Sequence, residues 1–515
     1  MKSRNELKLG SLLSYGQMFL NILIGLVYTP VMIRLLGKSE YGLYNTVSST
    51  ISMLSILNLG FSSSYIRYFA KYKKEKEETK IHKLNGMFLL IFICIGVIAL
   101  LSGLYLAFHL NLVFDTGLTE AEYRTAKVLM LLLTGGLAIS FPMTVFTCII
   151  SAHEKFTFLK LLGMGKTVLS PLVTLPVLLM GYRSVGMVTI GFLVGIVVDI
   201  IYIVYTFRVI KAKFVFHGFE KGLLKSLFTY TVFIAINLII DQINWNIDKI
   251  LLGRFQGTVM VAIYSVGYSL YSYYMNFSTS ISGVFTPRIH KIVNETADDA
   301  VLQKSRLTEL FIRVGRIQFL LLGLLASGIV FFGESFIVRY WVGAGYEDAY
   351  WVAILLILPA SIALIQNLGI EIQRAENKHQ FRSIVYLAMA IINLVLSVIL
   401  CQKYGAIGSA IGTAIALIVA IGIIMNIYYH KRCNIDILLF WKSILQSAKG
   451  LLLPVAFGVF CHWFFPAANL GIYLLQILLY TIIYSDSVWM LSMNDYVKSL
   501  VMQPLQKIVK GVKND

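Results

Sequence analysis

Long apolar runs, separated by short polar segments, dominate the chain. Each run has few charges and about 20 residues, enough for a helix rising 1.5 Å per residue to cross about 30 Å of hydrocarbon. The chain shows no ten-residue alternation of hydrophobic and polar positions, the pattern of outer-membrane barrel strands. The sequence therefore predicts an all-α integral membrane protein with about fourteen transmembrane helices. Residues 241–255 are polar and leave open a long turn or an interrupted helix end.

The order of motifs in the first half returns about 220 residues later, as expected for a duplicated bundle. The alignment pairs Gly37 with Gly253, Tyr44 with Tyr264 and Arg67 with Arg288, and a second pair of stretches, 152–158 and 375–381, keeps the offset. Six spans in each half give both halves the same topology, so the sequence predicts two six-helix lobes related by a pseudo-twofold axis along the membrane normal.

These repeats define the predicted domains. Residues 1–215 form an N-lobe with spans 1–6, residues 216–432 form a C-lobe with spans 7–12, and residues 433–515 contain a helix pair and a cytoplasmic tail. Small residues four positions apart, Gly191 with Gly195 and the series from Gly408, predict close helix packing.

Composition and charge agree with this class. The chain is 58% hydrophobic and 14% charged, with a net charge of +18. Lys and Arg concentrate in the connections on the side of both termini, which the positive-inside rule assigns to the cytoplasm. We therefore expect a multi-pass membrane protein with both termini cytoplasmic, and no nucleic-acid partner. The first apolar run lacks a cleavage pattern and is interpreted as a retained helix.

The sequence contains no constellation typical of an enzyme. It has no P-loop, no Gly-x-Ser-x-Gly and no His-x-x-x-His pair, and its five cysteines fit neither a disulfide nor a zinc pattern. We predict no catalytic residues, no bound metal and no cofactor, apart from a coupling ion (H+ or Na+).

Charges within the spans are the best candidates for a functional site, because a charge at the bilayer centre costs about 2.5 to 3.5 kcal/mol. The substrate-binding candidates are Arg67, Arg288 and Lys166. Arg67 and Arg288 are repeat-related, and two guanidiniums facing one cavity suit a pyrophosphate; the alternative is that each reaches the cytoplasmic headgroups. Lys166 lies deeper in its span.

A second set of candidates concerns gating or ion coupling. Asp199 can carry a coupling proton or pair with a neighbouring cation, and Pro30 permits a bend in the first span. The remaining candidates are polar residues at or near span ends: Asp241, Asp248, Lys249, Glu371 and Arg374.

Four motifs resemble one known family. They are residues 36–44 (LGKSEYGLY), 58–61 (NLGF) followed by Arg67, 248–255 (DKILLGRF) and 373–378 (QRAENK). They are similar to the polysaccharide-export branch of the multidrug/oligosaccharidyl-lipid/polysaccharide (MOP) flippase superfamily, the Wzx-type flippases of O-antigen or capsule repeat units.

The resemblance implies a V of two lobes like those of MATE and MurJ transporters, with a cationic central cavity. It further implies a place in the bacterial inner (plasma) membrane, alternating access, and transfer of undecaprenyl-pyrophosphate-linked oligosaccharide to the outer leaflet for lipopolysaccharide or capsule synthesis. The implied partners are that lipid-linked oligosaccharide, membrane lipids, and a polysaccharide polymerase with its chain-length machinery.

Other functions remain open at this level. A cation- or proton-coupled multidrug antiporter of the same superfamily would need an acidic lumen, and a peptidoglycan-precursor flippase is a close variant. A membrane polysaccharide polymerase or ligase would need a sizeable external loop, whereas the predicted loops hold about a dozen residues.

Overall fold

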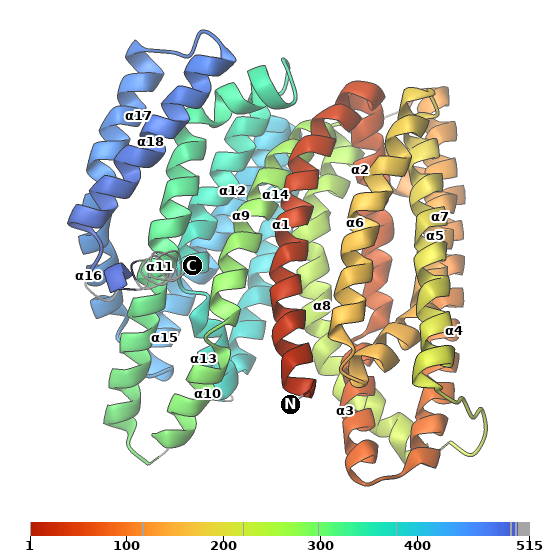
Figure 1. The fold of residues 1–515 in the computed structure, drawn as a ribbon. Coiled ribbons are helices and arrows are strands. Elements are labelled where there is room, and N and C mark those ends of the chain that lie inside the picture. The colour runs from red at the N-terminus through yellow and green to blue at the C-terminus, as the bar shows by residue number, and fades with distance from the viewer. Residues whose placement is uncertain are drawn as a thin grey trace, which may run out of the picture. The chain divides into compact units, whose positions relative to one another are not determined.

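The fold is helical throughout the part of the chain that the structure describes. The computed structural model describes residues 2–115, 118–219, 221–296, 298–376, 378–494, 497–499 and 502 (Figure 1). Ten of its helical segments are long and apolar enough to cross a membrane. The predicted all-α membrane class is therefore confirmed, whereas the number of about fourteen spans and the pseudo-twofold symmetry stay predictions.

The chain forms two compact units. The first consists of Met1–Ser265 and Leu394–Ser409, and the second of Val266–Asn393 and Ala410–Asp515. The lobe boundaries predicted from the repeat, 1–215, 216–432 and 433–515, stay predictions.

Long helices in the first unit pack side by side. The helices of this unit are α1 (Lys2–Leu36), α2 (Lys38–Met53), α3 (Phe61–Lys74), α4 (Glu78–Phe108), α5 (Glu120–Ala152), α6 (Phe156–Leu179), α7 (Arg183–Tyr205), α8 (Lys221–Phe255), the start of α9 (Thr258–Gly283) and the Leu394–Ser409 part of α14 (His379–Leu417). α4 packs along α5 and α1 along α6. A Cβ added at Gly96 would lie 2.6 Å from the Ala138 carbonyl oxygen, so a small residue is needed where α4 and α5 meet.

The second predicted span is interrupted. α2 ends at Met53, a 3₁₀ turn covers Leu54–Asn58, and Leu59 (φ 48°) and Gly60 (φ 77°) turn the chain before α3. Aromatic side chains then fix α3 against α4, because Phe61 and Tyr65 make edge contacts with Phe88. The motif at residues 58–61 thus marks a helix break, and α3 carries Arg67.

Two expectations about glycines are corrected. Gly37, in the turn before α2, has a φ of 80°. In the turn before α9, the glycine with a matching φ is Gly257 (φ 81°), and it lies as far from Gly37 along the chain as Tyr264 lies from Tyr44. Gly253, the predicted partner of Gly37, instead lies inside α8, where an added Cβ would be 2.5 Å from Thr46.

Gly191 and Gly195 do not mediate close packing, since an added Cβ at either would meet nothing within 4 Å. Gly408 does, because its Cβ would lie 2.1 Å from the Leu400 carbonyl oxygen. α8 continues as a helix to Phe255, so residues 241–255 do not form a long turn.

The second unit surrounds a 36-residue helix, α11 (Ala300–Ser335). The other helices are α10 (Thr286–Glu295), α12 (Glu347–Ile365), α13 (Leu368–Ala375), α14 (His379–Leu417), α15 (Asn426–Arg432), α16 (Ile437–Ala448), α17 (Leu452–Phe464) and α18 (Leu470–Leu491). Tyr484 of α18 donates a 2.6 Å hydrogen bond to the Leu320 carbonyl of α11 and so ties the C-terminal helix pair to this unit. Gly405 (φ 56°, ψ −133°) breaks α14 into two limbs.

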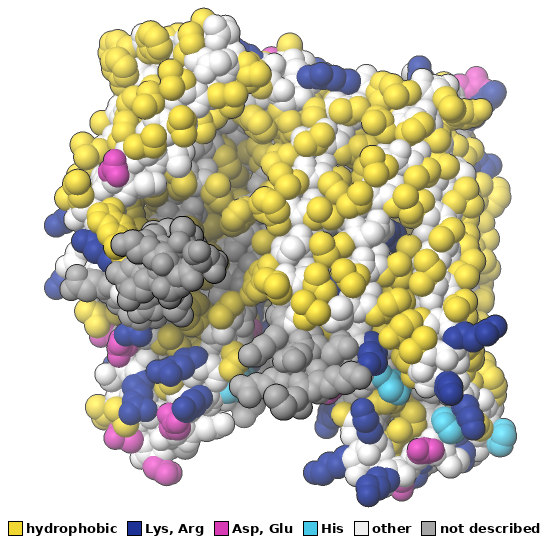
Figure 2. Space-filling view, viewed as in Figure 1, with side chains coloured by type: hydrophobic (Ala, Val, Ile, Leu, Met, Phe, Trp, Pro, Cys, Tyr) yellow, Lys and Arg dark blue, Asp and Glu magenta, His cyan; other side chains and the backbone are white. Residues whose placement is uncertain are grey.

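Apolar side chains cover much of the helix surface on the face drawn in Figure 2, as lipid contact requires. In the first unit, Lys and Arg gather at the end that carries α3 (Figure 2).

Candidate functional site

A cavity of about 690 Å³ lies within the first unit. Its wall comes from five helices: α1, α2, α5, α6 and α7. Two of the predicted candidates, Lys166 of α6 and Asp199 of α7, line it together.

Lys166 and Asp199 face this cavity from two adjacent helices, α6 and α7. The sequence suggested a neighbouring cation for Asp199 without identifying it, and the structure supplies Lys166. α6 and α7 pack against each other, so residues 33 positions apart reach the same space. The cavity therefore holds one positive and one negative side chain, of which Lys166 is exposed and Asp199 half-buried.

Hydroxyl groups complete the polar lining. The hydroxyls of Tyr28 in α1 and Thr174 in α6 share a 2.8 Å hydrogen bond, and Ser140 and Ser170 also face the cavity. Gly191 lines the wall of α7 without a side chain and leaves room for a guest. Hydroxyls, an aromatic ring and one ammonium can bind sugar hydroxyls or a phosphate oxygen.

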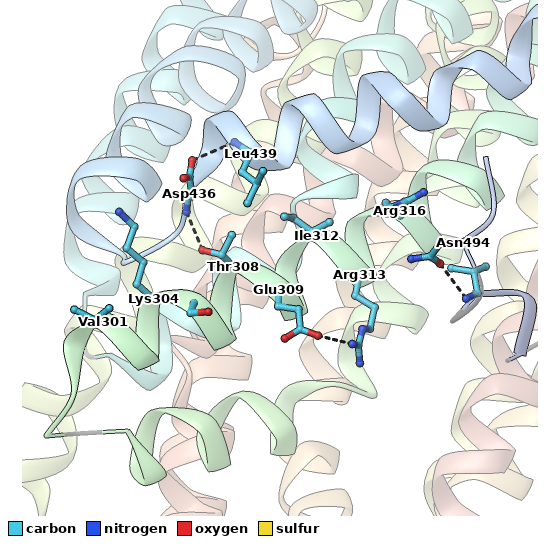
Figure 3. Close-up of a pocket in the computed structure, with 12 residues that line it drawn as sticks. Val301, Lys304, Thr308, Glu309, Ile312, Arg313, Arg316, Asp436, Leu439 and Asn494 are labelled. Atoms are coloured by element: carbon cyan, nitrogen blue, oxygen red, sulfur yellow. Dashed lines mark hydrogen bonds and ion pairs between the residues drawn. The ribbon is translucent and has the colours of Figure 1, made fainter. Parts of the chain in front are cut away.

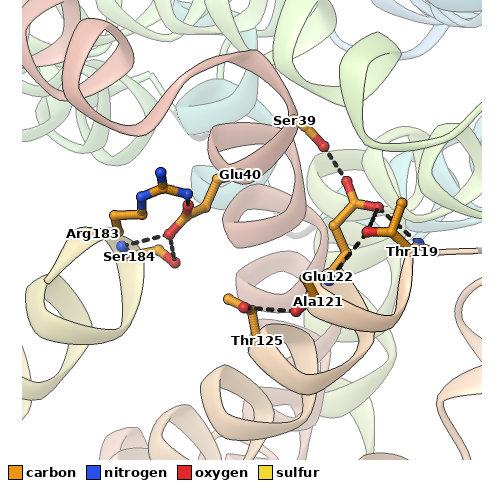
Figure 4. A network of polar contacts seen from close by, with 8 residues as sticks. All are labelled: Ser39, Glu40, Thr119, Ala121, Glu122, Thr125, Arg183 and Ser184. Atoms are coloured by element: carbon orange, nitrogen blue, oxygen red, sulfur yellow. Dashed lines mark hydrogen bonds and ion pairs between the residues drawn. The ribbon is translucent and has the colours of Figure 1, made fainter. Parts of the chain in front are cut away.

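The start of α2 joins several helices at the end of the bundle that the topology predicts to be external (Figure 4). Glu40 accepts hydrogen bonds from the backbone N–H (2.8 Å) and hydroxyl (2.5 Å) of Ser184, which begins α7. Ser39 donates to Glu122 in the first turn of α5 and lies 2.8 Å from the hydroxyl of Thr258 at the start of α9. Two adjacent side chains thus connect α2 to α5, α7 and α9.

Gly42 brings α2 and α9 into direct backbone contact. A Cβ added at Gly42 would lie 1.7 Å from the carbonyl oxygen of Thr258, a separation that no side chain allows. The motif at residues 36–44 is therefore explained by a turn at Gly37, polar links at Ser39 and Glu40, and a close approach at Gly42.

Asp248 forms a second polar centre at the same end of the first unit. Its carboxylate is 3% exposed and accepts hydrogen bonds from Tyr264 of α9 (2.8 Å) and from Ser397 (2.8 Å) and Ser409 (2.7 Å) of α14. Three hydroxyl donors satisfy a buried carboxylate that would otherwise be costly. Asp248 therefore fixes the ends of α8 and α9 to both limbs of α14.

The other cationic candidates, Arg67 and Arg288, lie in short helices that follow interrupted spans. Arg67 is exposed on α3 in the first unit, and Arg288 is exposed on α10 in the second. Their shared cavity stays a prediction.

The remaining candidates are distributed over both units. Asp241 is exposed and Lys249 half-buried on α8, and Pro30 lies inside α1. Glu371 and Arg374 form a 2.6 Å ion pair one turn apart on α13, with Arg374 exposed. The gating, coupling and hinge roles of these residues stay predictions.

Sequence reasoning missed Ser39, Glu40, Glu122 and Thr258. A signal for Glu122 exists, because Thr119 and Glu122 form a capping box at the start of α5. Ser39 and Glu40 stand inside the motif at residues 36–44, which was interpreted from the internal repeat and from its likeness to a family.

Membrane-spanning helices around an internal polar cavity define a multi-pass membrane protein with a candidate binding cavity. The chain belongs to the family of polysaccharide biosynthesis proteins, whose model matches residues 8–293. A protein of Shigella flexneri described as an O-antigen transporter is 21% identical over 425 residues, which cover 80% of this chain and 95% of the relative. An Escherichia coli protein with the same description is 23% identical over 76% of this chain and 89% of its own length.

Solved structures show the same fold at low identity. The lipid II flippase MurJ in an inward closed conformation matches with a TM-score of 0.68 at 15% identity, over 96% of this chain and 99% of its own. The MATE multidrug transporter DinF-BH matches with a TM-score of 0.56 at 18% identity, over 83% of this chain and 96% of its own. These findings confirm the predicted polysaccharide family, and the solved structures confirm the predicted fold.

Proposed function

We propose that this protein is a flippase that moves undecaprenyl-pyrophosphate-linked oligosaccharide units from the cytoplasmic to the outer leaflet of the bacterial inner membrane, for surface polysaccharide synthesis. The observation that carries the proposal is the cavity of the first unit, where Lys166 and Asp199 lie among hydroxyl groups in a chain of the polysaccharide biosynthesis family. Both termini are cytoplasmic in this proposal. The polymerase and chain-length machinery act on the product.

In this proposal, different cavity residues contact different parts of the substrate. Lys166 provides a cation for a phosphate oxygen, and Tyr28 and Thr174 offer hydroxyls to the sugar. Arg67 and Arg288 provide further guanidiniums on the cytoplasmic side.

Asp199 supplies a means of ion coupling. We assign Lys166 as the counter-charge of Asp199 before substrate binds, because both side chains line the cavity. A pyrophosphate that engages Lys166 removes this balance and favours binding of H+ or Na+ at the carboxylate. Substrate and coupling ion then occupy the cavity together.

Alternating access requires an external end that closes and opens. The hydrogen bonds of Ser39, Glu40 and Asp248 hold helix ends together there, and hydroxyl-to-carboxylate bonds can be exchanged for water at modest net cost. We assign these contacts to the closed external gate.

The test is reconstitution of the full chain into proteoliposomes with a fluorescent undecaprenyl-pyrophosphate oligosaccharide. Accessibility of the label to an external quencher then reports movement between leaflets. We expect movement with the wild type and with Lys160→Gln, a control on α6 outside the cavity, and a strong reduction with Lys166→Gln. Equal movement in protein-free vesicles contradicts the proposal, and uptake of a cationic dye without lipid movement identifies a multidrug antiporter instead.

A further inference from the structure

A second cavity lies in the second unit, outside the transport site. It has a volume of about 560 Å³ and is bordered by the first half of α11, by α16 and by the segment with Asn494 and Val497 (Figure 3). We call it the α11–α16 groove.

One face of α11 forms the floor of the groove. Its lining residues recur every three or four positions, the spacing of a single helix face: Val301, Lys304, Ser305, Thr308, Glu309, Ile312, Arg313 and Arg316. Three of these side chains are cations, and Ser305 and Thr308 add hydroxyls.

The two acids of the groove are already engaged by protein groups. Glu309 pairs with Arg313 at 2.5 Å, and Asp436 caps α16 by accepting the backbone N–H of Leu439 at 3.1 Å (Figure 3). Donors remain. Arg316 lines the groove, and the hydrogen bond that its guanidinium makes to the described residues is from Nη2 to the Ser492 carbonyl at 2.8 Å. Within the described part of the chain, Lys304 has no ion pair either.

The groove lies at a membrane boundary. After Arg316, α11 carries no charge until Glu334, a stretch long enough to span most of the hydrocarbon. On α16, Leu438 and Leu445 are 73% and 69% exposed, so this helix offers an apolar face to lipid while Leu439 lines the groove. Cationic donors beside an apolar wall fit an amphiphile with a negatively charged head.

We propose that the α11–α16 groove binds the phosphate of an anionic membrane phospholipid, with Arg316 and Lys304 as its donors and the apolar face of α16 along the lipid chains. Arg binds phosphate oxygens through its fork of N–H groups, and Lys adds charge near an anionic surface. The bound lipid fastens α16 and the segment around Ser492 to α11. This site is distinct from the proposed transport cavity and does not depend on it.

The test measures lipid binding to the purified full-length protein by native mass spectrometry, with phosphatidylglycerol and with phosphatidylcholine. We expect preferential retention of phosphatidylglycerol and at least a fivefold loss of its binding in K304Q/R316Q. The control Lys442→Gln removes a cation from α16 outside the groove and should retain binding. Because R316Q also loses the bond to Ser492, Arg316→Lys serves as a second variant that keeps the charge, and it should bind more lipid than K304Q/R316Q.

Three outcomes overturn the proposal. One is equal phosphatidylglycerol binding by K304Q/R316Q and Lys442→Gln, and another is equal binding of the two lipids by the wild type. The third is displacement of phosphatidylglycerol by millimolar inorganic phosphate, which would identify a site for a soluble anion. Lipid movement by Lys166→Gln is measured in parallel, so failure of the transport proposal is distinguished from failure of this one.

Discussion

Gly42 of α2 lies against the carbonyl oxygen of Thr258 at the start of α9, where an added Cβ would be only 1.7 Å away. The neighbouring Ser39 hydroxyl lies 2.8 Å from that of Thr258, so a backbone contact and a side-chain contact join the same two helix starts. A contact that admits no side chain is a sensitive point at which to disturb the proposed external gate.

We predict that Gly42→Ala weakens this closure and slows lipid movement by roughly tenfold, because overpacking typically costs about 1–3 kcal/mol. The quencher assay in proteoliposomes measures the rate. Gly135→Ala is the matched control, since an added Cβ at this glycine of α5 meets nothing within 4 Å. Equal rates for the two variants would show that the contact between Gly42 and Thr258 plays no part in transport.

Asp248→Asn should destabilise the folded protein. The carboxylate accepts from three hydroxyls, and an amide offers one oxygen in its place and brings two donors of its own. We expect a loss of about 1–3 kcal/mol and a lower Tm in detergent. Asp241→Asn, an exposed carboxylate on the same helix, should leave the Tm nearly unchanged.

Cys433 should resist alkylation in the native protein. It is fully buried just beyond α15, and this burial raises the pKa of its thiol to about 12, so the reactive thiolate is scarce at pH 8. Mass spectrometry after treatment with a maleimide should find Cys433 unmodified in native membranes and modified after denaturation. Rapid labelling before denaturation would contradict the packing of the second unit.

Arg67→Ala and Arg288→Ala should each reduce surface polysaccharide at normal protein levels, since each removes a proposed contact to pyrophosphate. The double variant tests cooperation. If the arginines bind the same pyrophosphate, it should lose no more export than the more severe single variant. Arg124→Gln is the control, because this exposed residue pairs only one turn away with Glu120. Undiminished export in both single variants would assign Arg67 and Arg288 to headgroup contact.

The sequence predicted the membrane class because the length and apolarity of a span are properties of one segment. It also identified Lys166 and Asp199 as intramembrane charges. It could not predict that they share a cavity, since this depends on how α6 rotates against α7. Gly191 shows the same limit: the spacing of small residues predicts helix contact equally well whether the exposed backbone faces a helix or, as here, a cavity.

Ser39 and Glu40 could not be recognised for a different reason. Polar residues at the start of a helix are common, and only the folded chain shows that these two reach Ser184, Glu122 and Thr258. Asp248 was identified from its position near a span end, yet two of its three partners come from α14, 149 and 161 residues further along the chain.

Because Lys166 of α6 and Asp199 of α7 line one cavity, we expect lipid movement to depend on which of the two helices carries the cation. Lys166→Gln leaves Asp199 unbalanced and removes the proposed phosphate contact, so lipid movement should fall strongly, by about tenfold or more. Asp199→Asn keeps that contact and removes the proposed ion site, so movement should persist but lose its dependence on an H+ or Na+ gradient.

The double exchange, Lys166→Asp with Asp199→Lys, distinguishes an effect of charge balance in the cavity from an effect of the position of the cation. It keeps the net charge of the cavity and moves the cation from α6 to α7. If the pair matters only for charge balance, movement returns toward wild type. If Lys166 contacts the phosphate from α6, lipid movement stays low while the Tm is close to that of the wild type. We expect this second result. Full activity of Lys166→Gln would remove the pair from the mechanism altogether.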